Sequence, residues 1–275
     1  MGILVKLDKA RELMSNDLLI TVENQVATVT FNRPQQRNAI NLAMWQGLPT
    51  LCQQLDDDAA IRVVIWRGAG DAAFSAGGDI SEFAALRSNR DQAEAYNATV
   101  DAALTRILQL RKPTIALIKG YCMGGGLMLA AHCDLRIAAA NAQFGIPVAN
   151  LGALITYTEM QRFIHVMGVA ATTELLLTGR LYDVREAQTV GLCTQVYPLD
   201  MIDEQVQKLT ARMAKLAPFS QQWHKAMLQT LLHKPDINAI TSEELARVNA
   251  CFDSADYQEG TLAFLEKRAP NFQGK

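Results

Sequence analysis

Two glycine-bearing stretches, about fifty residues apart, decide the fold of this chain. The first reads Phe74-Ser75-Ala76-Gly77-Gly78-Asp79-Ile80, and the second reads Lys119-Gly120-Tyr121-Cys122-Met123-Gly124-Gly125-Gly126-Leu127-Met128. Each stretch follows an apolar run typical of a β-strand and precedes a helical pattern, so each places bare backbone N–H groups at a strand-to-helix turn. Two such donors that converge on one point would bind a developing negative oxygen.

Strands alternate with helices on both sides of these stretches. A hairpin is predicted over residues 18–31, and short buried strands over 61–66, 114–118 and 134–138. Asn41 is a plausible cap for a helix whose apolar stripe includes Leu55, although Pro49 should kink or interrupt it. A longer helix is predicted over 91–110.

From about Tyr157 onward helical periodicity dominates, broken at glycines and prolines. The sequence therefore predicts an α/β core over residues 1–200, followed by a helical region over 201–275 with a soft boundary.

Composition narrows the classes of function. The chain has 275 residues, 49% hydrophobic and 20% charged, with a net charge of −2. The sequence has no basic excess that would predict a nucleic-acid partner, and it has no apolar run of membrane-spanning length. The five cysteines are scattered without a C-x-x-C pair. They fit a reducing compartment and predict neither a metal site nor a disulfide framework, so a cytoplasmic location is expected.

The triple glycine alone has several readings. A structural turn or a close helix–strand contact would also need it. It lacks the lysine–serine ending of a P-loop and the G-x-G-x-x-G of a dinucleotide site. A carbonyl oxygen is a better ligand for converging N–H groups, and a thioester is a good candidate because its reactions pass through an enolate or a tetrahedral oxyanion.

The chain resembles the enoyl-CoA hydratase/isomerase family, also called the crotonase superfamily, nearly from end to end. The matching segments are Phe31-Asn32-Arg33-Pro34, Arg37-Asn38-Ala39, 74–80, Lys112-Pro113-Thr114, 120–126, 133–138, Phe144-Gly145-Ile146-Pro147, Gln161-Arg162, 177–180, Glu259-Gly260 and 263–268. The resemblance implies a spiral of ββα repeats, with a C-terminal helical region that makes homotrimers or hexamers. It also implies an acyl-CoA substrate, so that coenzyme A enters with the substrate and no cofactor is bound.

The resemblance also assigns roles to residues. It places the two oxyanion-binding N–H groups at Ala76 and Gly125, an adenine pocket at 78–80, and phosphate-binding charges at Arg37 and, from a neighbouring subunit, Lys267. A solvated surface charge is the alternative for the last two. The residues expected to contact the CoA ester are Arg37, Gly78, Asp79, Ile80, Gly124, Met128, Val148 and Lys267.

The chain departs from the family where hydratases carry two glutamates. Those positions are Met128 and Val148, and the twenty-residue spacing is kept (148 − 128 = 20). Neither side chain can transfer a proton, so hydration by two carboxylates is not expected. Glu159 and Tyr157, in a loop that is usually glycine-rich, are candidate replacements. The alternatives are a helix-starting glutamate and a packed tyrosine. His132 is a further candidate or a buried structural histidine.

Three functions remain open at this stage. The first is an acyl-CoA enzyme that uses the oxyanion-binding N–H groups without the two glutamates, and decarboxylation of a malonyl-type thioester suits it best, with thioester hydrolysis or isomerisation as variants. The second is a conventional enoyl-CoA hydratase. The third is a catalytically silent acyl-CoA-binding protein.

Overall fold

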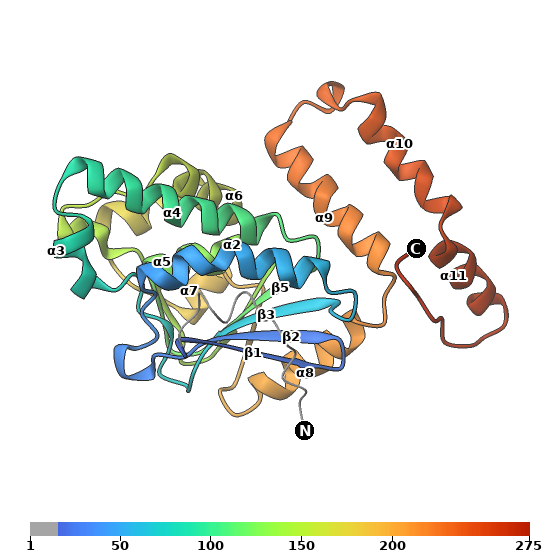
Figure 1. Cartoon of the computed structure of the whole chain (residues 1–275), viewed down its shortest axis with the longest axis horizontal. Coiled ribbons are helices and arrows are strands. Elements are labelled where there is room, and N and C mark those ends of the chain that lie inside the picture. The colour runs from blue at the N-terminus through green and yellow to red at the C-terminus, as the bar shows by residue number, and fades with distance from the viewer. Residues whose placement is uncertain (1–15) are drawn as a thin grey trace.

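The protein is described by a computed structural model over residues 16–275. A six-stranded sheet forms its centre, with strands in the order β1-β2-β3-β5-β7-β10 (Figure 1). Only the β1–β2 pair, the predicted hairpin, is antiparallel within this sheet. The six strands are β1 (Leu18–Glu23), β2 (Val26–Phe31), β3 (Val63–Gly68), β5 (Thr114–Ile118), β7 (Leu135–Ala139) and β10 (Gln195–Tyr197).

A second, four-stranded sheet has the order β4-β6-β8-β9. Its strands are β4 (Ala73–Ser75), β6 (Tyr121–Met123), β8 (Gln143–Gly145) and β9 (Tyr182–Asp183). Each of β3, β5 and β7 in the large sheet is followed by a short strand of the small sheet, and a helix comes next. This repeated ββα unit confirms the predicted α/β spiral.

The helices cover both faces of the large sheet and extend beyond it. They are α2 (Leu42–Asp57), α3 (Phe83–Leu86), α4 (Arg90–Leu108), α5 (Gly125–His132), α6 (Tyr157–Thr178), α7 (Val184–Thr189), α8 (Ile202–Met213), α9 (Pro218–His233), α10 (Ser242–Ala250) and α11 (Ala255–Leu265). Short 3-10 turns lie at Pro34–Gln36, Ile80–Glu82, Pro147–Leu151, Ile237–Ala239 and Cys251–Asp253.

Alternating residues of the parallel strands fill two separate cores. In β3, Val64 and Trp66 point into the large core, whereas Val63 and Ile65 join a smaller cluster on the other face. That smaller cluster is covered by α8 through residues such as Ile202. Successive side chains of a strand point to opposite faces, and here both faces are buried. This explains why these strands are almost wholly apolar.

Helix α2 starts where the sequence predicts, because the Asn41 side chain accepts a hydrogen bond from the N–H of Met44 at 2.9 Å. Of the kink or interruption expected at Pro49, the interruption is wrong: α2 continues through the proline to Asp57. Proline in a helix interior costs about 3 kcal/mol. The fully buried Leu48 and Leu51, which flank the proline, pack into the large core and offset that cost.

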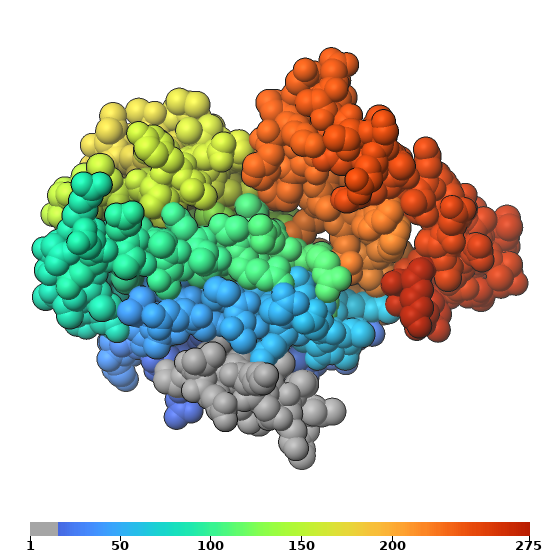
Figure 2. Space-filling model, turned by 45° about the horizontal axis from the view of Figure 1, so that its top comes forward, coloured from blue at the N-terminus to red at the C-terminus, as the bar shows by residue number. Residues whose placement is uncertain are grey.

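The C-terminal helices α9, α10 and α11 stand to one side of the sheet-containing core, as the orange and red segments in Figures 1 and 2 show. These helices and the 3-10 turns between them expose large apolar side chains, among them Leu228, Ile237, Leu245, Phe252, Phe264 and Leu265. Helix α8 lies beyond residue 200 yet packs on the sheet, so the boundary at 200/201 stays a prediction. Within residues 16–275, no helix is long and apolar enough to cross a membrane.

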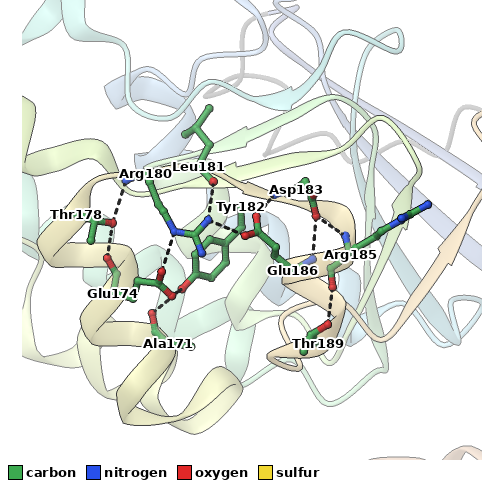
Figure 3. A network of polar contacts seen from close by, with 10 residues as sticks. All are labelled: Ala171, Glu174, Thr178, Arg180, Leu181, Tyr182, Asp183, Arg185, Glu186 and Thr189. Atoms are coloured by element: carbon green, nitrogen blue, oxygen red, sulfur yellow. Dashed lines mark hydrogen bonds and ion pairs between the residues drawn. The ribbon is translucent and has the colours of Figure 1, made fainter.

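A polar network holds β9 against its neighbours (Figure 3). The Arg180 guanidinium donates to Glu174 Oε1 at 2.9 Å and to Glu186 Oε1 at 2.8 Å, and it lies 4.4 Å from the centre of the Tyr182 ring. Tyr182 Oη donates to Glu174 Oε2 at 2.9 Å. These contacts join α6, β9 and α7, so that β9 is fixed as the edge strand beside β8.

Candidate functional site

A cavity of about 130 Å³ lies where the two glycine-bearing stretches meet. Segments from five parts of the chain surround it: α2, the turn at 76–80, α3 with α4, the start of α5, and the segment 147–159. The lining residues are Trp45, Ala76, Gly77, Gly78, Ile80, Phe83, Arg87, Tyr96, Asn97, Val100, Met123, Gly124, Gly125, Met128, Pro147, Val148, Leu151, Ala153, Leu154 and Glu159.

The first stretch reaches the cavity through a single parallel bridge between Ile40 and Gly78. The Ile40 N–H donates to the Gly77 oxygen at 2.8 Å, and the Asp79 N–H donates to the Ile40 oxygen at 3.0 Å. Because a parallel bridge uses the residues before and after its central residue, the N–H of Gly78 is left over. Within residues 16–275, this N–H has no hydrogen-bond partner.

The structure corrects the expectation for Ala76. Its N–H donates to the carbonyl oxygen of Arg37 at 2.9 Å, so this donor is already used inside the fold. Ala76 still lines the cavity. The unpaired N–H of the first stretch that lies beside Gly125 belongs to Gly78, two residues further on.

The second stretch supplies Gly125, the first residue of α5. An N-terminal helical residue has no intrahelical acceptor for its N–H, and the Gly124 that precedes it carries no side-chain cap. Gly124 itself donates its N–H to the Gly145 oxygen of β8 at 2.9 Å, which fixes the turn. A Cβ atom at Gly126 would lie 2.6 Å from the Cβ of Ser75, so only glycine lets α5 approach β4 this closely.

The two unpaired amides lie next to each other. A Cβ atom at Gly77 would lie 3.4 Å from the nitrogen of Gly125, and one at Gly125 would lie 3.4 Å from the nitrogen of Gly78. Both Gly78 and Gly125 line the cavity. A pair of fixed N–H donors with the positive end of α5 behind one of them suits an oxygen that gains negative charge.

Residues 33–39 hold the first amide in place. The buried Asn38 donates through Nδ2 to the Ala73 oxygen at 2.7 Å, at the start of β4. Arg33 forms an ion pair with Asp79 at 2.8 Å. Hydrogen bonds from Ser81, then the bond and charge of Arg33, hold the pKa of Asp79 below its ordinary value. Asp79 therefore stabilises the turn that carries Gly78, and it does not line the cavity.

The hydratase-type carboxylates are replaced by apolar contacts. Met128, on the first turns of α5, and Val148, in the 3-10 turn after β8, both line the cavity. Neither carries a titratable group, so this part of the wall cannot move a proton.

Glu159 is the one carboxylate among the lining residues. It is buried, and its Oε2 accepts the N–H of Thr156 at 2.7 Å in a capping box at the start of α6. Burial raises the pKa of Glu159, and the nearby Asp101 acts in the same direction. The helix-starting role is thus present, and the carboxyl group also faces the cavity. Tyr157 is 91% exposed and does not line the cavity.

His132 lies elsewhere. Its ring Nδ1 is 2.7 Å from the Met128 oxygen, and its side chain borders a different cleft, between α6 and α9. Burial lowers the pKa of His132 to about 4, so the ring is neutral at physiological pH. His132 is therefore placed as a buried structural histidine, the alternative that the sequence left open.

Two of the expected substrate-binding charges do not line the cavity. Arg37 is exposed, and its guanidinium lies 5.3 Å from the centre of the Tyr121 ring. Lys267 follows α11, which stands apart from the sheet-containing core (Figure 1), and it does not line the cavity. Gly78, Ile80, Gly124, Met128 and Val148 line the cavity as expected.

Several lining residues are not among the predicted site residues, and three of them carry an indole, guanidinium or amide group: Trp45, Arg87 and Asn97. Trp45 belongs to the apolar stripe of α2, which gave no reason to separate it from core residues. Arg87 and Asn97 lie in a charged, polar stretch of helical pattern, where sequence alone does not tell a cavity-facing arginine from a solvated one.

Comparisons with known proteins bear on the whole chain. The enoyl-CoA hydratase/isomerase family model matches residues 21–275. A probable enoyl-CoA hydratase of Mycobacterium bovis is 36% identical, covering 93% of this chain and 97% of that protein. The 2,3-dehydroadipyl-CoA hydratase of Escherichia coli is 31% identical, covering 94% and 100%. The crystal structure of an enoyl-CoA hydratase/carnithine racemase from Magnetospirillum magneticum matches with a TM-score of 0.91 and 39% identity, covering 95% of this chain and 97% of that one.

Proposed function

Since this chain belongs to the enoyl-CoA hydratase/isomerase family, we propose that it is an enzyme that acts on acyl-CoA thioesters by stabilising a thioester enolate. The observation that carries the proposal is the pair of unpaired N–H groups of Gly78 and Gly125 at one cavity. The thioester oxygen would accept a hydrogen bond from each. One preorganised donor of this kind is worth roughly 3–4 kcal/mol of the barrier.

The proton chemistry rests on one carboxyl group. Met128 and Val148 remove the two-glutamate route to hydration, and Glu159 is the carboxylate that remains at the cavity. Because burial raises its pKa, Glu159 keeps its proton to a higher pH than an exposed glutamate does. It is therefore suited to donate a proton to an enolate.

Decarboxylation of a malonyl-type thioester fits this arrangement best. The bond between Cα and the carboxylate carbon breaks, its electron pair enters the enolate, and carbon dioxide leaves without prior removal of a proton. Glu159 then protonates Cα and regains a proton from water. Double-bond isomerisation is the second candidate, because a single carboxyl group can take a proton from one carbon and return it to another.

A panel of three esters separates these functions. Purified protein is incubated with malonyl-CoA, but-3-enoyl-CoA and crotonyl-CoA, and products are identified by mass spectrometry. We expect acetyl-CoA from the first or crotonyl-CoA from the second, and no 3-hydroxybutyryl-CoA from the third. Rapid hydration of crotonyl-CoA would contradict the one-carboxyl mechanism. Binding of these esters without any product would instead favour a silent acyl-CoA-binding protein.

The assembly is part of the same proposal. The exposed apolar residues of α9–α11 would be covered in a homotrimer or in a hexamer built from two trimers. Lys267 of one copy would then approach the CoA phosphates bound by another. Light scattering coupled to size-exclusion chromatography measures the mass directly, and a monomer of 30.2 kDa would contradict this part.

A further inference from the structure

Arg87 is held at the cavity wall by aromatic rings. It follows α3, where its N–H donates to the Phe83 oxygen at 2.8 Å. Its guanidinium carbon lies 4.8 Å from the centre of the Phe83 ring and 5.0 Å from that of Tyr96. The two rings pack edge to face, with 5.9 Å between their centres. An arginine stacked in this way keeps the edge of its guanidinium plane, with its N–H donors, free for a ligand.

The guanidinium of Arg87 forms no ion pair with the described residues 16–275. Within residues 16–275, no carboxylate lies within 4.0 Å of its guanidinium, and its one side-chain hydrogen bond is a long contact of 3.4 Å to Asn97 Oδ1. Glu159 faces the same cavity, and the charge of Arg87 favours its ionised form, but no ion pair joins the two side chains, and the Glu159 carboxyl group accepts the Thr156 N–H instead. Of the described residues that line the cavity, Arg87 is the only one with a cationic side chain. A half-buried guanidinium in a largely apolar wall is favourable only with an anionic partner.

The ring pair also connects Arg87 with the amide site. A Cβ atom at Gly78 would lie 3.0 Å from Tyr96 Oη and 3.4 Å from atoms of the Phe83 ring. The Gly78 amide and the Arg87 guanidinium therefore border the same two rings. A thioester whose oxygen is bound at Gly78 and Gly125 has its acyl group inside the cavity that Arg87 lines.

We propose that Arg87 binds a carboxylate carried by the acyl group, so that the substrates are CoA thioesters of dicarboxylic acids. The guanidinium edge donates two parallel hydrogen bonds to that carboxylate, with Asn97 beside it. This inference rests on the proposed function and narrows it: a malonyl thioester is the shortest member of the class whose α-carbon can form an enolate. Arg87 is a specificity-determining residue in this view, since the enolate is stabilised elsewhere.

The test compares matched esters on matched variants. Isothermal titration calorimetry measures the Kd of succinyl-, glutaryl- and adipyl-CoA against butyryl-, valeryl- and hexanoyl-CoA, which have the same chain lengths without the second carboxylate. The proteins are the wild type, Arg87→Gln, Arg87→Lys and the control Arg90→Gln, which removes an exposed arginine at the start of α4 that does not line the cavity.

We expect Arg87→Gln to raise the Kd of at least one dicarboxylic ester by about 10- to 100-fold more than it raises the Kd of the neutral ester of the same length. This is the range of a charge-assisted hydrogen-bonded pair. Arg87→Lys retains part of the preference, because it keeps the charge and loses the stacked, forked geometry. Arg90→Gln binds all six esters as the wild type does.

Two results would overturn the inference and leave the proposed function standing. Arg87→Gln could weaken both members of each pair equally, in which case Arg87 binds the coenzyme or shapes the wall. Alternatively, the preference could be the same in Arg87→Gln and the wild type. If the wild type binds none of the six esters, the proposed function itself fails together with the inference.

Discussion

Gly78 and Gly125 lie 47 positions apart in sequence, yet a Cβ atom at Gly125 would lie 3.4 Å from the Gly78 nitrogen. Each N–H lacks a partner within the described residues 16–275 for a different local reason. Gly78 is the central residue of a parallel bridge, and Gly125 is the first residue of a helix. Neither amide depends on a side chain, so the pair is a property of the backbone path.

A β-branched residue at position 125 should remove this pair. Its Cβ would meet the Trp45 ring at 3.0 Å and the Gly78 nitrogen at 3.4 Å. For Gly125→Val we expect turnover to fall by about 100- to 1,000-fold, the effect of losing one preorganised donor. Steady-state kinetics on the ester that the wild type converts measures this. A thermal melt confirms folding, and undiminished turnover in a folded variant would count against the mechanism.

Restoring the two missing carboxylates tests why hydration is absent. The double variant Met128→Glu, Val148→Glu should gain measurable hydration of crotonyl-CoA. The loss of absorbance of the enoyl thioester measures this reaction. Each single variant should gain less, because addition of water needs an acid and a base. The double variant should also be less stable, since burying carboxyl groups costs about 1–3 kcal/mol each. A folded double variant without any hydration would show that the cavity excludes water.

Glu159→Gln separates proton transfer from helix capping. The amide oxygen of glutamine can still accept the Thr156 N–H, so the start of α6 should persist. We expect kcat to fall by roughly 100- to 10,000-fold while ester binding stays within a few-fold. Because burial raises the pKa of Glu159, the wild-type rate should decline as pH rises through that value, when the donor loses its proton. An unchanged kcat in the variant would leave Glu159 as a cap alone.

His132 should limit stability in acid. Its pKa is about 4 in the fold, against 6.5 for an exposed histidine, because burial disfavours the charged ring. The unfolded chain therefore takes up a proton first as pH falls from 6.5 to 4, and stability present above pH 6.5 is lost over that window. The loss from this group is about 3 kcal/mol.

Urea unfolding at several pH values measures this loss. His132→Gln should lose less stability than the wild type between pH 6.5 and 4. The control His233→Gln, at an exposed position on α9, should follow the wild type. Parallel curves for all three proteins would contradict the prediction.

The strands β1, β2, β3, β5 and β7 and the helices α2 and α4 could be predicted from sequence because they follow local patterns, whereas the short strands of the small sheet could not. The strand over 114–118 and the Asn41 cap are confirmed residue by residue. The donor assignment at Ala76 failed for a different reason: whether an amide is free depends on where the Arg37 oxygen lies, which is a tertiary fact. Arg87 gave no signal either, since its neighbours Phe83 and Tyr96 come together only in the fold.

The hydrogen bond from Gly124 to the Gly145 oxygen links the start of α5 to a distant part of the fold. Strand β8 carries that oxygen, β9 lies against β8, and the Arg180 network secures β9. The orientation of the Gly125 N–H therefore depends in part on a cluster of α6, β9 and α7 residues that do not line the cavity. Substitutions in that cluster would change the rate without changing any residue of the cavity wall.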